Sequence, residues 1–146
     1  MADWLDRYFA AWARHAQASD PRTGAEEMAR LLSFMAEDVR YEDVPSGSVF
    51  VGHDGVRQMA AAAYSMSADL DIKCVSAQTS GDQFAFESEA HGTNTGALGP
   101  IPASGKRFAL RSVSIGRISV EGKVVLHKDY WDMAGFLAQI ARMPKT

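Results

Sequence analysis

The sequence predicts an α+β fold in which helices cover one face of a curved antiparallel sheet. Apolar residues recur at helical spacing in three segments before residue 67, whereas most of the later chain alternates with a period of two. Short glycine-containing turns separate the alternating segments, and strands joined by such turns usually pair as neighbours. We therefore expect one domain over residues 1–146, with helices packed on the sheet and a closed-ended apolar cavity between the two layers.

Three helices are predicted in the first half of the chain. The first spans residues 3–18, where Asp3 can cap its start. Its apolar stripe consists of Trp4, Leu5, Tyr8, Phe9, Ala11 and Trp12. Two further helices are expected at about residues 25–36 and 54–66. Turn-forming residues precede each of them, namely Pro21 and Gly24, then Pro45, Gly47 and Gly52.

The strand predictions rest on alternating β-branched and aromatic residues. The first such segment is "VRYEDV" at residues 39–44, between the second and third helices. Four longer segments follow the third helix, at residues 71–80, 82–96, 105–120 and 123–131. A short helix at residues 133–142 closes the chain.

Composition excludes several classes of function. The apolar share of 47% and charged share of 23% are those of a globular protein in water. A net charge of −3 without a cluster of Lys and Arg argues against nucleic acid as a partner. The apolar stretch around residues 59–64 is too short to span a membrane, and the single cysteine, Cys74, cannot form an intramolecular disulfide. We expect a cytoplasmic protein.

Ionisable residues recur in the predicted strands with a spacing of two, which places them in rows on one face of each strand. Tyr41 and Asp43 form one row, and His127, Asp129 and Trp131 form another. A third row contains Glu87, Glu89 and His91. If neighbouring strands bring such rows together in a pocket, burial would raise the pKa of a carboxyl group there toward neutral pH.

Each of these residues also has a structural explanation. Asp129 can be an acid satisfied by backbone at a strand end, and Asp43 precedes a Pro-Gly loop in which Asp is a common turn former. His91 and His127 can be ordinary strand histidines. Trp12 and Met59 are expected in the core or the pocket lining. The four histidines lack metal-ligand spacing and Cys74 is isolated, so we expect neither a metal nor a cofactor.

Three segments resemble the SnoaL-like polyketide cyclases of the nuclear transport factor 2-like fold. They are "VGHDGVRQM" at residues 51–59, "GTNTGALGPIPASGKRF" at 92–108 and "GKVVLHKDYWDMAGFLAQI" at 122–140. The resemblance implies a cone-shaped α+β barrel that binds an apolar small molecule. In these cyclases a carboxylate near the end of the last strand acts with a histidine of a neighbouring strand, which implies Asp129 and His91.

Ketosteroid isomerases share this fold, and two segments resemble them. "YEDVP" at residues 41–45 resembles the loop of their general base, which implies that role for Asp43. "RYFAAW" at residues 7–12 resembles the helix that carries their oxyanion-binding tyrosine, which implies Tyr8. The chain departs from these isomerases at Ser114, where they carry a protonated aspartate, so the oxyanion hole would be weaker.

Limonene epoxide hydrolase offers a third resemblance, because its last strand reads Arg-Asp-Tyr-Phe-Asp where this chain has "KDYWD" at residues 128–132. Its water-holding tyrosine and asparagine match Tyr41 and Asp43. Its Arg-x-Asp pair falls on Glu89 and His91, which reverses one charge and replaces an acid by an imidazole. These two changes count against epoxide hydrolysis by the same relay of side chains.

These observations predict a cofactor-independent acid/base enzyme that removes a proton alpha to a carbonyl of an apolar small molecule. Asp129 would be the base, His91 and Tyr41 would donate hydrogen bonds to the enolate, and Asp43 would be a second acid/base. The residues expected to bind the substrate are Tyr8, Trp12, Met59, Glu89, Ser114, His127 and Trp131. Epoxide hydrolysis and non-catalytic binding are the alternative functions. We also expect a homodimer through the outer sheet face, formed by Arg111, Val113, Ile115 and Arg117.

Overall fold

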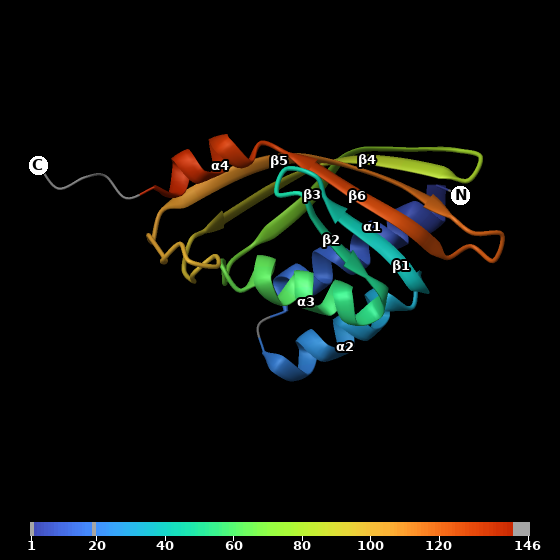
Figure 1. Cartoon of the computed structure of the whole chain (residues 1–146), viewed down its shortest axis with the longest axis horizontal. Coiled ribbons are helices and arrows are strands. Elements are labelled where there is room, and N and C mark those ends of the chain that lie inside the picture. The colour runs from blue at the N-terminus through green and yellow to red at the C-terminus, as the bar shows by residue number, and fades with distance from the viewer. Residues whose placement is uncertain (1, 19, 142–146) are drawn as a thin grey trace, which may run out of the picture.

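The computed structural model describes residues 2–18 and 20–141. Within these residues, four helices and six strands follow one another (Figure 1). Their order is α1 (Ala2–Gln17), α2 (Pro21–Leu32), β1 (Met35–Asp43), β2 (Ser48–Val51), α3 (Gly52–Tyr64), β3 (Asp71–Ser80), β4 (Gln83–Thr93), β5 (Arg107–Ile118), β6 (Val124–Trp131) and α4 (Met133–Ile140). The predicted α+β class is confirmed.

The six strands form one open, mixed sheet in the order β2-β1-β6-β5-β4-β3. Strands β3 to β6 form the expected antiparallel meander. The expectation that every pair is antiparallel is wrong at one place, because β1 and β6 pair in parallel. These two strands are far apart in sequence, so no short turn dictates their direction. The sheet does not close into a full barrel, because β2 and β3 are its edges.

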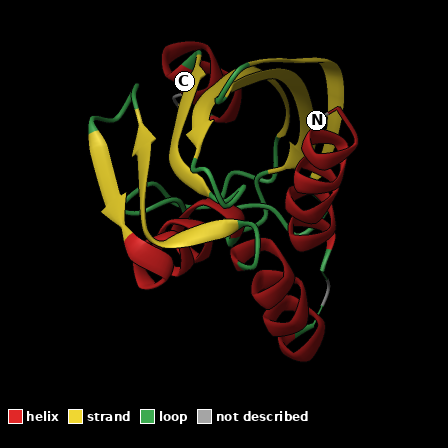
Figure 2. Ribbon diagram, turned by 90° about the vertical axis from the view of Figure 1, so that its right-hand side faces the viewer, coloured by secondary structure: helices red, strands yellow, loops and turns green. Residues whose placement is uncertain are grey.

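The helices lie on one face of the strongly curved sheet, apart from α4 at its far end (Figures 1 and 2). Helix α1 packs against β3 and α2, whereas α3 packs against β1. Helix α4 packs against β5, where the Gln139 side chain forms hydrogen bonds with both the backbone N–H and the carbonyl of Ala109. No helix within residues 2–18 and 20–141 is long and apolar enough to cross a membrane.

Helix α2 begins four residues earlier than predicted. Asp20 caps it by accepting a hydrogen bond from the Thr23 backbone N–H at 2.9 Å, and Pro21 occupies the first helical position. Proline fits there because the first N–H groups of a helix need no intrahelical partner. The stretch "DPRTG" at residues 20–24 is thus mainly a helix start. The predicted loop around Pro45 contains the unexpected strand β2, which forms a hairpin with β1.

The buried side chains form two clusters. The larger, here called the helical core, joins α1, α2 and α3 to the inner sheet face and contains Tyr8, Trp12, Tyr41 and Met59. The smaller, here called the α4 core, includes Phe108 and Phe136, with Leu110 and Trp131 packed against it. The strands that contribute residues to these two clusters also carry the polar side chains of the inner sheet face.

Candidate active site

Strand register brings five of the predicted site residues together on the inner face of the sheet. In the parallel pair β1–β6, Tyr41 lies opposite His127 and Asp43 lies opposite Asp129. In the antiparallel pair β5–β6, Ser114 lies opposite Asp129. The face is the inner one because Tyr41 and His127 are buried in contact with aromatic rings of α1.

Asp129 is the centre of a hydrogen-bond network. Its Oδ1 accepts a bond from the Ser114 hydroxyl at 2.6 Å and lies 2.8 Å from the His127 Nε2, while Tyr41 donates its hydroxyl hydrogen to Oδ2. The exposed fraction of the Asp129 side chain is only 23%. Burial raises the pKa of Asp129 to about 8 because desolvation penalises the charged carboxylate. This carboxyl group can therefore gain or lose a proton near neutral pH.

His127 links that acid to helix α1. The exposed fraction of its side chain is 2%, its ring stacks on Tyr41 at 4.7 Å between centroids, and its Nδ1 lies 2.8 Å from the Tyr8 hydroxyl. Burial lowers the pKa of His127 to about 3, so the imidazole is neutral at physiological pH. A neutral imidazole has one donor and one acceptor nitrogen, so it can form hydrogen bonds with Asp129 and Tyr8 at the same time.

The network can be satisfied in two protonation states. When Asp129 is ionised, His127 donates from Nε2 and accepts from the Tyr8 hydroxyl at Nδ1. When Asp129 is protonated, it can donate to Nε2, and Nδ1 can donate to the Tyr8 oxygen. The pair is therefore built to stabilise both states of the acid.

The far end of this network lies among aromatic rings of the helical core. Burial raises the pKa of Tyr8 well above its usual value, so its hydroxyl stays protonated. The buried Trp12 N–H has no hydrogen-bond partner among the residues that the structure describes. Trp12 also lies against Tyr41 and His127. Tyr8 and Trp12 thus lie close to the His127–Asp129 pair, and Met59 is buried in the same core.

Asp43 and Trp131 form a second polar contact beside Asp129. The Trp131 indole N–H donates to the Asp43 Oδ1 at 2.5 Å, and the Ser46 hydroxyl donates to the other carboxyl oxygen. Both side chains are half-buried. Asp43 therefore combines the turn-forming role with a position next to the acid.

His91 and Glu89 do not belong to this site, which corrects the sequence-based prediction. Both lie on the outer face of β4, where His91 is exposed and Glu89 forms an ion pair with Arg111 at 3.2 Å. The inward residues of β4 include Phe84 and Phe86, so the odd-numbered positions face out. The alternation of these phenylalanines was the signal that could have shown this. The histidine next to Asp129 is instead His127, which the sequence places in the same row and for which it predicts a substrate-binding role.

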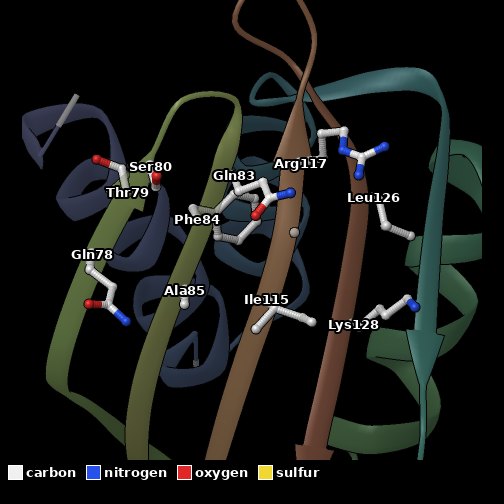
Figure 3. A pocket seen from close by; sticks show the side chains of 11 residues that line it. Gln78, Thr79, Ser80, Gln83, Phe84, Ala85, Ile115, Arg117, Leu126 and Lys128 are labelled. Atoms are coloured by element: carbon white, nitrogen blue, oxygen red, sulfur yellow. The ribbon is translucent and has the colours of Figure 1, made fainter.

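The outer face carries a separate groove of about 500 Å³ (Figure 3). Ala85 and Ile115 of neighbouring strands line this groove, and Arg117 and Lys128 lie at its side. Since Lys128 and Asp129 are adjacent in a strand, they point to opposite faces. The groove is therefore separate from the acid/base network. Within residues 2–18 and 20–141, no group of three or more His, Cys, Asp or Glu is arranged to hold a metal ion.

Comparison with known proteins identifies the class to which this fold and site belong. The family model of the SnoaL-like polyketide cyclases matches residues 5–140. This protein therefore belongs to the SnoaL-like polyketide cyclase family. A search of curated proteins finds no match.

Solved structures agree with this assignment at the level of fold. A candidate SnoaL-like polyketide cyclase from Jannaschia sp. CCS1 has a TM-score of 0.81 and 16% identity, covering 98% of this chain and 92% of that one. TsrD from Streptomyces laurentii has a TM-score of 0.78 and 23% identity, covering 97% of each chain. A protein with a ketosteroid isomerase-like fold from Catenulispora acidiphila, solved with trimethylamine, has a TM-score of 0.70 and 22% identity, covering 91% of each chain.

Proposed function

We propose that this protein is a cofactor-independent acid/base enzyme that removes a proton alpha to a carbonyl of an apolar small molecule, as a cyclase or an isomerase. The observation that carries the proposal is the enclosed Asp129 carboxyl group, which has a pKa of about 8 and three hydrogen-bond partners. A base works best when its pKa lies near the working pH. A sizeable fraction of the carboxyl group is then ionised, and the carboxylate still has a strong driving force to accept a proton.

Asp129 acts as the base and takes the proton from the substrate carbon. The proton goes to the Asp129 Oδ2, so Oδ1 still accepts hydrogen bonds from the Ser114 hydroxyl and the His127 Nε2–H. Once Asp129 is protonated, Tyr41 donates its hydroxyl hydrogen to the enolate oxygen instead of to the carboxylate. Asp43 is the second acid/base, and its position opposite Asp129 in the β1–β6 register supports that role. His91 has no part in this scheme.

An apolar substrate is supported by the surroundings of Asp129 on the inner face. Leu110 and Trp131 lie on this face and remain half-buried next to the α4 core. Apolar walls with a few placed polar groups are typical of sites that bind small organic molecules. Ser114 and Trp131 contribute hydrogen-bond donors at the border of this apolar surface.

Exchange of alpha protons in D₂O tests the proposal without knowledge of the natural substrate. We would incubate 2-tetralone, a bicyclic ketone with acidic alpha protons, and follow the loss of its alpha-proton NMR signals over the buffer rate. Asp129→Asn should lower the enzymatic rate by about 10² to 10⁴-fold, because it removes the base. Asp82→Asn, in the exposed turn between β3 and β4, is the matched control. Full-rate exchange by Asp129→Asn would reject Asp129 as the base.

Epoxide hydrolysis has no observation of this structure in its favour. The relay positions that the resemblance implies, Glu89 and His91, face away from Tyr41 and Asp43 on the other side of the sheet. Incubation with limonene epoxide and detection of the diol would distinguish that reaction from proton abstraction.

A further inference from the structure

Two serine hydroxyls form an isolated polar pair on the inner sheet face near Asp129. Ser88 of β4 and Ser112 of β5 are opposite one another in register, and their Oγ atoms lie 2.7 Å apart. The exposed fraction of Ser88 is 5%, and Ser112 is half-buried. The pair lies on the face that the helices cover, one inward position along β5 from Ser114.

The pair has hydrogen-bonding capacity that the protein does not use. Among the residues that the structure describes, each of these two hydroxyls has only the other as its hydrogen-bond partner. One hydroxyl donates to the other, so one O–H hydrogen stays free, together with lone pairs on both oxygens. Buried polar groups normally find partners, so a free donor and free acceptors at this position are ready for a polar group of a ligand.

The position of the pair relative to the acid is set by the strand. Ser112 is two residues from Ser114, whose hydroxyl donates to Asp129. At about 3.3 Å per residue, the two serines are separated by about 7 Å along β5. That separation is about the length of a fused pair of six-membered rings, so a bicyclic molecule could reach both points.

The surface around the serine pair is apolar. Along β5 the next inward residue is Leu110, and along β4 the inward neighbours are Phe86 and Ala90. Trp131 lies opposite Ser112 in the β5–β6 register. Two hydroxyls within an apolar surface favour a ligand with an oxygen atom at that position. A ligand without this oxygen would leave the buried hydroxyls unpaired, which costs binding free energy.

We propose that Ser88 and Ser112 form a second polar subsite that binds a hydroxyl or carbonyl oxygen at the far end of the substrate. This inference rests on the proposed function and deepens it, because it assigns the residues that bind a second oxygen of the substrate. That oxygen lies about 7 Å along β5 from Ser114, whose hydroxyl donates to Asp129.

A matched pair of ketones tests this subsite. Isothermal titration calorimetry would give the Kd of 2-tetralone and of 6-hydroxy-2-tetralone, which adds a hydroxyl on the far ring. The wild-type protein should bind the hydroxylated ketone about threefold to tenfold more tightly, as one hydrogen bond in a buried site provides. Ser112→Ala should reduce this ratio, and the double variant Ser88→Ala/Ser112→Ala should bring it to about one. Ser80→Ala, at the exposed end of β3, is the control that keeps the ratio.

The outcomes separate this inference from the proposed function. A wild-type ratio of one, no binding of the hydroxylated ketone, or an unchanged ratio in the double variant would overturn the subsite. If the ratio behaves as expected while neither ketone exchanges its alpha protons faster than in buffer, the subsite stands and the acid/base function fails. Thermal unfolding of each variant would show that the Ser→Ala changes leave the fold intact.

Discussion

The two faces of this sheet carry similar ionisable residues in very different surroundings. On the inner face, Asp129 and His127 form a hydrogen-bonded pair in which burial raises the pKa of the acid and lowers that of the imidazole. On the outer face, Glu89 lies in a partly exposed ion pair with Arg111, next to the exposed His91. Residue type alone therefore does not create an acid/base site. Removal from water and fixed partners create it.

The largest expected difference between the two faces concerns their histidines. His127→Phe keeps a ring against Tyr41 but removes one of the three hydrogen-bond partners of Asp129 and the imidazole partner of the Tyr8 hydroxyl. We expect the alpha-proton exchange rate to fall by about tenfold or more, and the free energy of unfolding to fall by about 1–3 kcal/mol. His91→Phe should change the free energy of unfolding by no more than about 0.5 kcal/mol and leave exchange unchanged. Exchange kinetics and urea unfolding measure both effects. A similar loss of exchange in the two variants would contradict the assignment of the acid/base site to the inner face.

The pH dependence of stability should reveal the same buried pair. The folded-state pKa of Asp129 is raised from 3.8 to about 8, so its contribution to stability is fully present below pH 4 and is lost as the pH rises to about 8. The folded-state pKa of His127 is lowered from 6.5 to about 3, so its contribution is present above pH 6.5 and is lost as the pH falls. Below pH 6.5 the two groups change the free energy of unfolding in opposite directions. Between pH 6.5 and 8 only Asp129 changes it.

In that window, the free energy of unfolding of the wild-type protein should fall by about 2 kcal/mol. Asp129→Asn should remove this fall, whereas Asp82→Asn should retain it. Urea unfolding at pH 6.5 and 8.5 gives the comparison. A flat profile for the wild-type protein would mean that Asp129 titrates as an ordinary carboxyl group, which would favour a non-catalytic binding protein.

The smallest expected effect on the acid/base chemistry comes from the outer face. Val113 and Ile115 are 43% and 39% exposed, and Arg111 and Arg117 lie on the same side of β5. We predict a homodimer through this face, with twice the chain mass of 15.9 kDa. Val113→Asp/Ile115→Asp should yield monomers in light scattering after size exclusion, because burying carboxylates in an interface is costly. Exchange at Asp129 should change little. A monomeric wild-type protein would contradict the prediction.

Much of the fold could be predicted because local patterns determine it. The stripe of Trp4, Tyr8 and Trp12 defined the buried face of α1, and the alternating segments defined β3 to β6. The rows of ionisable residues and a resemblance predicted that Tyr41 and Asp129 would line one pocket, and in the structure the two side chains are in contact. The start of α2 was missed because proline was interpreted as a break, although it also fits the first turn of a helix.

Only the tertiary structure decided which rows of side chains face inward and which strands become neighbours. A period of two shows that Glu89 and His91 share a face, and the phenylalanines on the opposite face of β4 favour the outer side for them. In β5 and β6, however, both faces mix polar and apolar residues, so their pattern does not say which face is buried. The parallel pairing that places Asp43 opposite Asp129 joins strands separated by the whole meander. Such contacts depend on how the helices cover the sheet. The sequence by itself determined the elements and the candidate acids, and long-range packing selected Asp129 with His127 as the enclosed pair, because burial is a property of the assembled layers.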